Sequence, residues 1–168
     1  MTLVGNNTYT GGTHINQGTL EVNGSQPGSF VLVGTNGTLA GIGTVGSASV
    51  DGTVSPSSLF TLPGTLTVMG NITFNAGSSF NVRLLGPGMF DQLNVTGMAF
   101  LNGNPTLNAC LGFVFPGITM NVLQAAGGVV GTFNGLPVSG MTFTDACLGM
   151  PNDLRIDYFA NFVQLTTM

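Results

Sequence analysis

Charge is scarce in this chain. Its 168 residues include two basic residues and six acidic ones, for a formal net charge of −4. Both basic residues are arginines, and Arg83 and Arg155 lie too far apart in the sequence to form the clustered positive patch that binds phosphate groups. The same shortage argues against an electrostatic contact with a lipid surface. We therefore expect no nucleic-acid partner and no membrane insertion by this segment.

Long apolar runs are also missing. No apolar stretch approaches the roughly 20 residues that a membrane-spanning helix needs. Residues 1–7 lack the charged and apolar regions of a signal peptide, so we expect a fragment or a processed product of a longer protein. Gly and Pro, 27 and 8 residues respectively, interrupt almost every stretch, so the sequence predicts almost no helix.

Cysteine is limited to Cys110 and Cys147, each within the tetrapeptide ACLG. A disulfide between them would suit an extracellular setting. Two separately buried thiols would fit the sequence equally well. The spacing alone does not show whether the two Cα atoms come within bridging range, so both interpretations stay open.

A recurring phrase is the strongest positive signal in the chain. It consists of Gly, then Thr or Ser, then an apolar residue that opens an alternating stretch. The copies are GTLEV at Gly18, GTLAG at Gly37, GTVSP at Gly52, GTLTV at Gly64 and GSSFNV at Gly77. Recurrence at intervals of this size indicates a repeat architecture.

Alternation within each copy predicts a strand with one buried face, because successive side chains on a strand point to opposite sides. One such strand cannot bury its apolar face alone, whereas stacked copies can, so the sequence predicts an all-β parallel β-solenoid. The residues expected to point inward are Leu20, Val22, Leu39, Leu66, Val68, Ile72, Phe74, Phe80 and Val82.

The composition changes near residue 76. We expect regular β-solenoid coils over residues 1–75, and a bulkier C-terminal β-solenoid and capping region over residues 76–168, continuous with the first. Both cysteines and nine of the 12 phenylalanines fall in the second part. A solenoid end exposes unpaired strand edges and an open core, so it needs a cap. The N-terminal end shows none, so we expect upstream coils of the same protein, or another copy of the chain, to stack there end to end.

Several segments resemble a known family. The stretch TYTGGTHINQGTLEVNGS, residues 8–25, resembles the autotransporter-associated β-strand repeat of bacterial autotransporter passengers and related surface proteins. The resemblance implies a right-handed parallel β-helix on the outside of a cell. It implies no particular activity, because such passengers include adhesins, structural stalks and enzymes. Further segments similar to these passengers are residues 39–56, 64–84, 90–97, 131–137 and 154–167.

Catalytic candidates are few. His14, the one histidine, lies beside the inward-pointing Ile15, so we expect it on the surface with no nearby carboxylate to orient it as a general base. Cys110 lacks a neighbouring base that would lower its pKa, which favours a structural role over that of a nucleophile.

The acidic residues suggest no site either. Asp153, Arg155 and Asp157 alternate on one expected strand face, which is either a small polar binding patch or, as we favour, a solvated face with weak ion pairs. Asp51 and Asp91 are isolated in the sequence. Neither the opposed carboxylates of a glycosidase nor the clustered oxygens of a calcium site are visible. We therefore predict no catalytic, metal-binding or cofactor-binding residue, and no cofactor.

The best interpretation is a non-enzymatic module, extracellular or on the cell surface. It would act as a structural rod or an adhesive segment whose outward Thr, Asn and Ser rows face surface glycans or other proteins. One alternative is a self-assembling extracellular filament subunit. A second, less favoured alternative is a carbohydrate-active β-helix enzyme.

Overall fold

The computed structural model describes residues 1–57, 63–113, 115–149 and 153–168. Every regular element in those residues is a β-strand. None of these residues belongs to a helix long and apolar enough to cross a membrane. The strands, in chain order, are β1 (Thr2–Leu3), β2 (Thr13–Val22), β3 (Ser25–Gln26), β4 (Val31–Gly41), β5 (Thr44–Val45), β6 (Ala48–Val50), β7 (Thr53–Pro56), β8 (Thr65–Val68), β9 (Ile72–Phe74), β10 (Ser79–Gly86), β11 (Met89–Phe90), β12 (Gln92–Val95), β13 (Met98–Leu101), β14 (Thr106–Leu111), β15 (Thr119–Ala125), β16 (Gly128–Gly131), β17 (Met141–Phe143), β18 (Leu154–Tyr158) and β19 (Phe162–Thr167).

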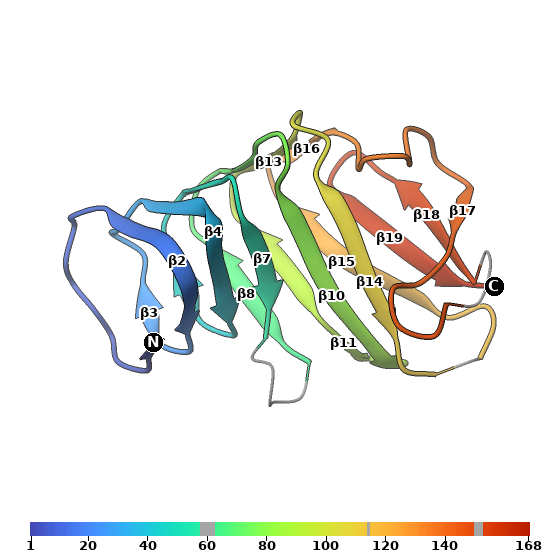
Figure 1. Ribbon diagram of the computed structural model, residues 1–168, viewed down its shortest axis with the longest axis horizontal. Coiled ribbons are helices and arrows are strands. Elements are labelled where there is room, and N and C mark those ends of the chain that lie inside the picture. Colours follow the sequence, from blue (N-terminus) through green and yellow to red (C-terminus); the bar gives the residue numbers. More distant parts are fainter. Residues whose placement is uncertain (58–62, 114, 150–152) are drawn as a thin grey trace.

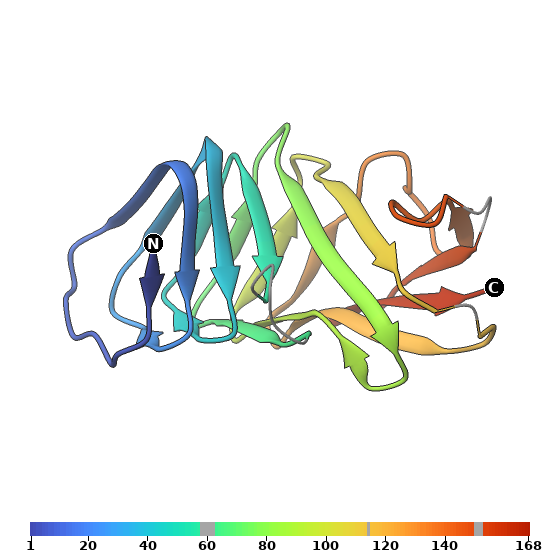
Figure 2. The same cartoon turned by 60° about the horizontal axis from the view of Figure 1, so that its bottom comes forward.

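Parallel ladders run along the long axis of the molecule and form three faces (Figure 1, Figure 2). Face 1 contains the first halves of β2 and β4, then β6, β9, β13 and β16. Face 2 contains β1, the second halves of β2 and β4, then β7, β10 and β14. Face 3 contains β3, β5, β8, β12 and β15. The chain visits the faces in turn, coil after coil, so the predicted parallel β-solenoid is confirmed.

Four of the five recurring phrases stack on face 2. Thr19 pairs with Thr38, Thr38 with Thr53, and Thr53 with Ser79. The copy that begins at Gly64 does not join them, because its strand β8 lies on face 3 between β5 and β12. The phrase therefore marks the start of a strand and not one fixed position in the coil.

In two copies of the phrase, the glycine is required by close stacking of the coils. A Cβ atom on Gly37 would clash with the carbonyl oxygen of Ile15 in the preceding coil. A Cβ atom on Gly52 would clash in the same way with the carbonyl oxygen of Gly37. Only glycine lets the backbone pass so close to the rung before it.

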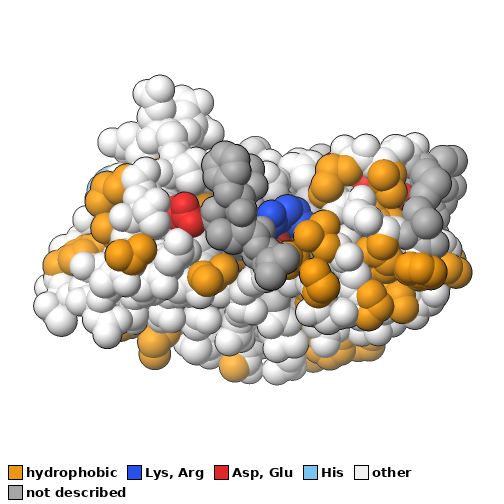
Figure 3. Space-filling view, turned by 90° about the horizontal axis from the view of Figure 1, so that it is seen from below, with side chains coloured by type: hydrophobic (Ala, Val, Ile, Leu, Met, Phe, Trp, Pro, Cys, Tyr) orange, Lys and Arg blue, Asp and Glu red, His pale blue; other side chains and the backbone are white. Residues whose placement is uncertain are grey.

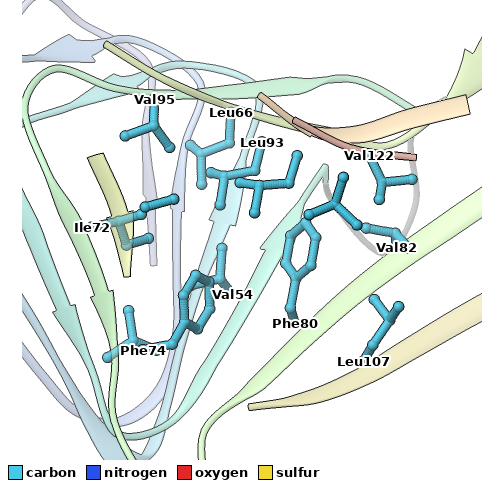
Figure 4. Close-up of a cluster of buried hydrophobic side chains, with 14 of the residues drawn as sticks. Val54, Leu66, Ile72, Phe74, Phe80, Val82, Leu93, Val95, Leu107 and Val122 are labelled. Atoms are coloured by element: carbon cyan, nitrogen blue, oxygen red, sulfur yellow. The ribbon is translucent and has the colours of Figure 1, made fainter. Parts of the chain in front are cut away.

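A continuous apolar core fills the solenoid (Figure 4). The nine residues expected to point inward are all buried; Leu20 is 6% exposed and the others 1% or less. Phe74 and Phe80 meet edge to face, with ring centroids 6.0 Å apart. The ladders continue without a break from residues 1–75 into residues 76–168, since β7 pairs with β10 and β8 pairs with β12.

The C-terminal end of the solenoid is covered. The last strand of face 3, β15, pairs antiparallel with β19, which pairs with β18, which pairs with β17. On face 2 the residues around Cys147 lie against the last strand, β14. The backbone N–H of Ala146 donates to the carbonyl oxygen of Ala109 over 2.7 Å, and a disulfide joins Cys110 to Cys147 with their Cα atoms 5.0 Å apart.

The N-terminal end remains open. Strand β1 pairs only with the second half of β2, so the first half of β2 has a partner only on the β4 side. A hollow of about 430 Å³ lies at this end, with the core residues Leu3, Ile15 and Leu20 in its lining. Tyr9 anchors the segment between β1 and β2, because its hydroxyl group forms hydrogen bonds with the side chains of Gln26 and Thr13.

Candidate functional site

A groove crosses the strands of face 2. It consists of two adjoining hollows, of about 380 Å³ and 220 Å³, that share Ser55, Ser57 and Asn81. Its ends are marked by Thr2 at the N-terminal side and Cys110 at the C-terminal side. Seen from below, charged side chains are sparse on the molecule, and hydrophobic ones gather over its C-terminal half (Figure 3).

A row of hydroxyl groups runs along this face. The register places five residues on successive rungs, of which the recurring phrase supplies four and Thr106, just before the inward-pointing Leu107, is the fifth. These residues are Thr19, Thr38, Thr53, Ser79 and Thr106. None of their side-chain hydroxyl groups forms a hydrogen bond to another residue that the structure describes.

A second row lies beside the first. Glu21, Ala40 and Ser55 occupy successive rungs, and Ala40, 5% exposed, is part of the groove lining. Asn81 and Asn108 continue the row, and the Nδ2 of Asn108 donates to the Oδ1 of Asn81 over 2.8 Å. Glu21 is the one acidic side chain in the lining that the structure describes. Its carboxylate accepts from the Nδ2 of Asn23 over 2.8 Å.

Arg83, in the lining of the C-terminal hollow, forms an ion pair with Asp91. The fully buried Asp91 accepts from the backbone N–H of Arg83 over 2.9 Å and from its Nε over 3.2 Å. The other oxygen of Asp91 accepts from the backbone N–H of Gly64 over 3.2 Å. Arg83 also donates from Nη2 to Ser57. Asp91, which is isolated in the sequence, is brought onto Arg83 by the β10–β11 hairpin.

The catalytic candidates do not assemble into a site. His14 lies exposed on β2, and Ile15 beside it is buried. No hydrogen bond joins the imidazole ring to a carboxylate or a hydroxyl group among the residues that the structure describes. Cys110, considered as a nucleophile, is in the disulfide with Cys147.

The expected solvated face of Asp153, Arg155 and Asp157 is only partly present. Arg155 and Asp157 form a half-buried ion pair, with Nε and Oδ2 2.9 Å apart. Asp153 instead precedes β18 and is only 7% exposed. Its Oδ1 accepts from the backbone N–H of Asp145 over 2.9 Å, and its buried Oδ2 has no partner among the residues that the structure describes. Placing Asp153 on a solvated face is therefore wrong, because the chain before β18 turns inward against Asp145.

Asp145 is a buried acidic side chain whose contacts the sequence did not reveal. Its carboxylate accepts backbone N–H groups from Cys147 over 2.7 Å, Leu148 over 2.8 Å and Gly149 over 3.0 Å. A fourth N–H, from Leu111 on β14, lies 3.3 Å away. Burial by itself raises the pKa of this carboxyl group, but these hydrogen bonds outweigh it and lower the pKa to about 2. The only local signal was an Asp shortly before a glycine, which is typical of a turn.

The pKa of Asp153 moves the other way. Burial raises it, and the neighbouring Asp145 carboxylate adds to the increase. In the part of the chain that the structure describes, no three His, Cys, Asp or Glu side chains lie close enough together to hold a metal ion.

Comparison with known proteins supports the expected family. Residues 1–22 match the family model described as passenger-associated-transport-repeat. Two proteins named extracellular serine protease, both from Serratia marcescens, are similar to this chain. One is 41% identical over 105 residues and the other 39% identical over 103 residues.

The alignments cover 61% of this chain but only 10% of either relative, so the chain spans about a tenth of the length of the curated relatives that it matches. The resemblance to bacterial autotransporter passengers is confirmed by the family match and by both relatives. The chain is similar to bacterial autotransporter passengers, its first coil matches the passenger-associated-transport-repeat, and both findings indicate a secreted or surface-located β-helical segment.

Proposed function

We propose that this segment is non-enzymatic and acts as a stiff rod with an adhesive side face. The single observation that carries the rod is the continuity of its three ladders. Each coil is bonded to the next on face 1, face 2 and face 3, and one core runs through all of them. Bending the rod at any point would break backbone hydrogen bonds in several strands at once.

The names of the relatives raise the question of proteolysis. A serine protease needs a serine, a base and an orienting acid within hydrogen-bonding reach of one another. His14 is the only histidine of this chain, and its ring makes no such contact with the described residues. We propose that this segment supports and presents other parts of a longer protein and does not itself cleave peptides.

A carbohydrate-active enzyme is less well supported. Its chemistry uses two carboxyl groups on opposite sides of a substrate bond. Asp145 and Asp153 lie together, but they are 3% and 7% exposed and bind backbone N–H groups.

Active-site labelling tests the non-enzymatic part of the proposal. The purified chain is incubated with a fluorophosphonate probe, which labels activated serines, and with unstructured protein substrates. We expect no labelling and no cleavage. Stoichiometric labelling of one serine that disappears in a His14→Ala variant would overturn the proposal.

Limited proteolysis tests the rod. A continuous ladder should resist cleavage everywhere except at surface loops, because a protease needs a locally unfolded strand. Cleavage within the strands of face 2 under native conditions would contradict a stiff rod.

A further inference from the structure

We propose that the groove on face 2 binds a neutral polysaccharide, extended along the long axis of the solenoid and therefore across the strands. The inference deepens the adhesive part of the proposed function and rests on it. It is carried by the hydroxyl row, by the repeat distance of its rungs and by the charge balance of the groove.

The hydroxyl row offers unused hydrogen-bonding capacity. Each hydroxyl group can donate one hydrogen bond and accept others. Three members of the row, Thr19, Thr38 and Thr53, line the groove; their hydroxyl groups have no partner among the described residues, so a ligand displaces only water from them. The amides of Asn81 and Asn108 add donors and acceptors beside the row. Sugar hydroxyl groups, which also donate and accept, are the matching chemistry.

The spacing between the strands of face 2 favours one kind of polymeric ligand over another. Adjacent strands lie about 4.8 Å apart, so five rungs span about 19 Å. An extended peptide presents side chains of one face every ~6.6–6.8 Å and falls out of step with the rungs almost at once. An extended β-1,4-linked pyranose chain advances by one ring over nearly one rung, and because successive rings are turned over, the same face of the sugar meets every second rung.

The charge balance favours a neutral chain. The positive charge of Arg83 is compensated by the buried Asp91, at 3.2 Å. Glu21 at the other end would repel an acidic polymer. No cluster of arginine or lysine is present to attract one, since the whole chain has only two basic residues.

The absence of aromatic side chains from the described lining sets the expected affinity. Without a ring to stack on, each sugar is held by hydrogen bonds that compete with water, so binding per rung is weak. Affinity must then accumulate over several rungs, which makes it depend steeply on ligand length.

Titration with defined oligosaccharides tests the proposal. The probes are neutral β-linked hexamers of glucose (1,4- and 1,3-linked) and of N-acetylglucosamine, the corresponding dimers, a galacturonic acid hexamer and an extended threonine-rich peptide. Backbone amide shifts of the intact chain are followed by NMR. We expect at least one neutral hexamer to bind saturably, with shifts along face 2, and about tenfold more weakly as the dimer.

The double variant Thr38→Val plus Thr53→Val removes two neighbouring hydroxyl groups and keeps β-branched side chains. It should weaken hexamer binding about fivefold or more with an unchanged melting temperature. Thr73→Val is the matched control, because Thr73 points outward on face 1, away from the groove. It should bind as the unaltered chain does.

Three results would overturn the proposal. These are no saturable binding by any neutral hexamer, tighter binding of the acidic hexamer or the peptide, and equal binding by the double variant and the control. Failure of the proposed rod would show differently, as cleavage within the strands or labelling of a serine, whether or not sugar binds.

Discussion

The backbone N–H of Asp145 donates to the Oδ1 of Asp153 over 2.9 Å, which brings two acidic side chains together inside the C-terminal cap. The pKa of Asp145 is lowered to about 2, and that of Asp153 is raised. Asp145 is held as a carboxylate by backbone N–H groups of the segment that covers β14. Ionising Asp153 would place a second negative charge in the same buried region, so the charged form of Asp153 is disfavoured.

Replacing Asp153 by Asn should stabilise the protein at neutral pH. A raised pKa means that the folded state holds a proton that the unfolded state has released. Stability is therefore lost as pH rises from the ordinary value of 3.8 through the raised pKa of Asp153, and Asn removes this loss. We expect a rise of about 2–4 °C in Tm at pH 7, the effect of ~1 kcal/mol in a domain of this size.

Thermal unfolding followed by circular dichroism at pH 7 and pH 4 checks this prediction. The gain from Asp153→Asn should shrink at pH 4, where the aspartate itself becomes protonated. Asp157→Asn is the control, since it affects only the half-buried pair with Arg155. A lower Tm for Asp153→Asn at pH 7 would show that the charge of Asp153 is stabilising.

Breaking the disulfide should loosen the C-terminal cap and leave the N-terminal coils intact. The bond closes a loop of 37 residues, for which the chain-entropy model gives about 4 kcal/mol as an upper figure. In a Cys110→Ser plus Cys147→Ser variant, amide hydrogen exchange should accelerate in β14 and residues 145–149. Exchange in β2 and β4 should stay within error, and uniform acceleration along the chain would contradict a local role for the bond.

A charge at Val68 should be far more damaging than one at Thr67. Val68 is fully buried on β8, whereas Thr67 points outward between Thr44 and Asn94. Val68→Asp buries a carboxyl group without a partner and should cost several kcal/mol. Thr67→Asp should cost less than about 1 kcal/mol. Urea midpoints measure both, and equal midpoints would mean that the strand register is wrong.

Self-association, if it uses strand edges, is predicted to proceed through the N-terminal end. Thr13 donates its N–H to Phe30 on the β4 side, so the N–H of His14 points to the open side. The opposite end is covered by β19 and the disulfide-bonded segment. Because only the N-terminal end is open, it can associate only with the N-terminal end of a second copy. We therefore expect a dimer and no larger assembly.

Light scattering over a wide concentration range measures this association. His14→Pro removes the edge donor and should abolish the pair. His14→Ala keeps the N–H group and should preserve it. Filaments, or a pair that survives His14→Pro, would contradict the N-terminal edge as the contact.

The strands and the inward-pointing residues follow from the sequence because they depend on local alternation. Leu66 and Val68 flank Thr67, and a strand turns adjacent side chains to opposite faces whatever its neighbours are. Glycine at Gly18 and Gly77 is local in origin, because the backbone there has a positive φ and no atom lies near the position of a Cβ. At Gly37 and Gly52 it reflects how closely one rung passes over another, which the tertiary structure decides.

Which strands become neighbours was decided only by the tertiary structure. The phrase at Gly64 looks like the other four, but the length of chain between coils places its strand on face 3. The pairing of Asp91 with Arg83 depends on a hairpin, and the approach of Asp145 to Asp153 depends on how the cap folds against β14. The groove arises in the same way: the sequence supplies a Thr or Ser before each inward residue, and the stacking of the coils aligns these residues into one row.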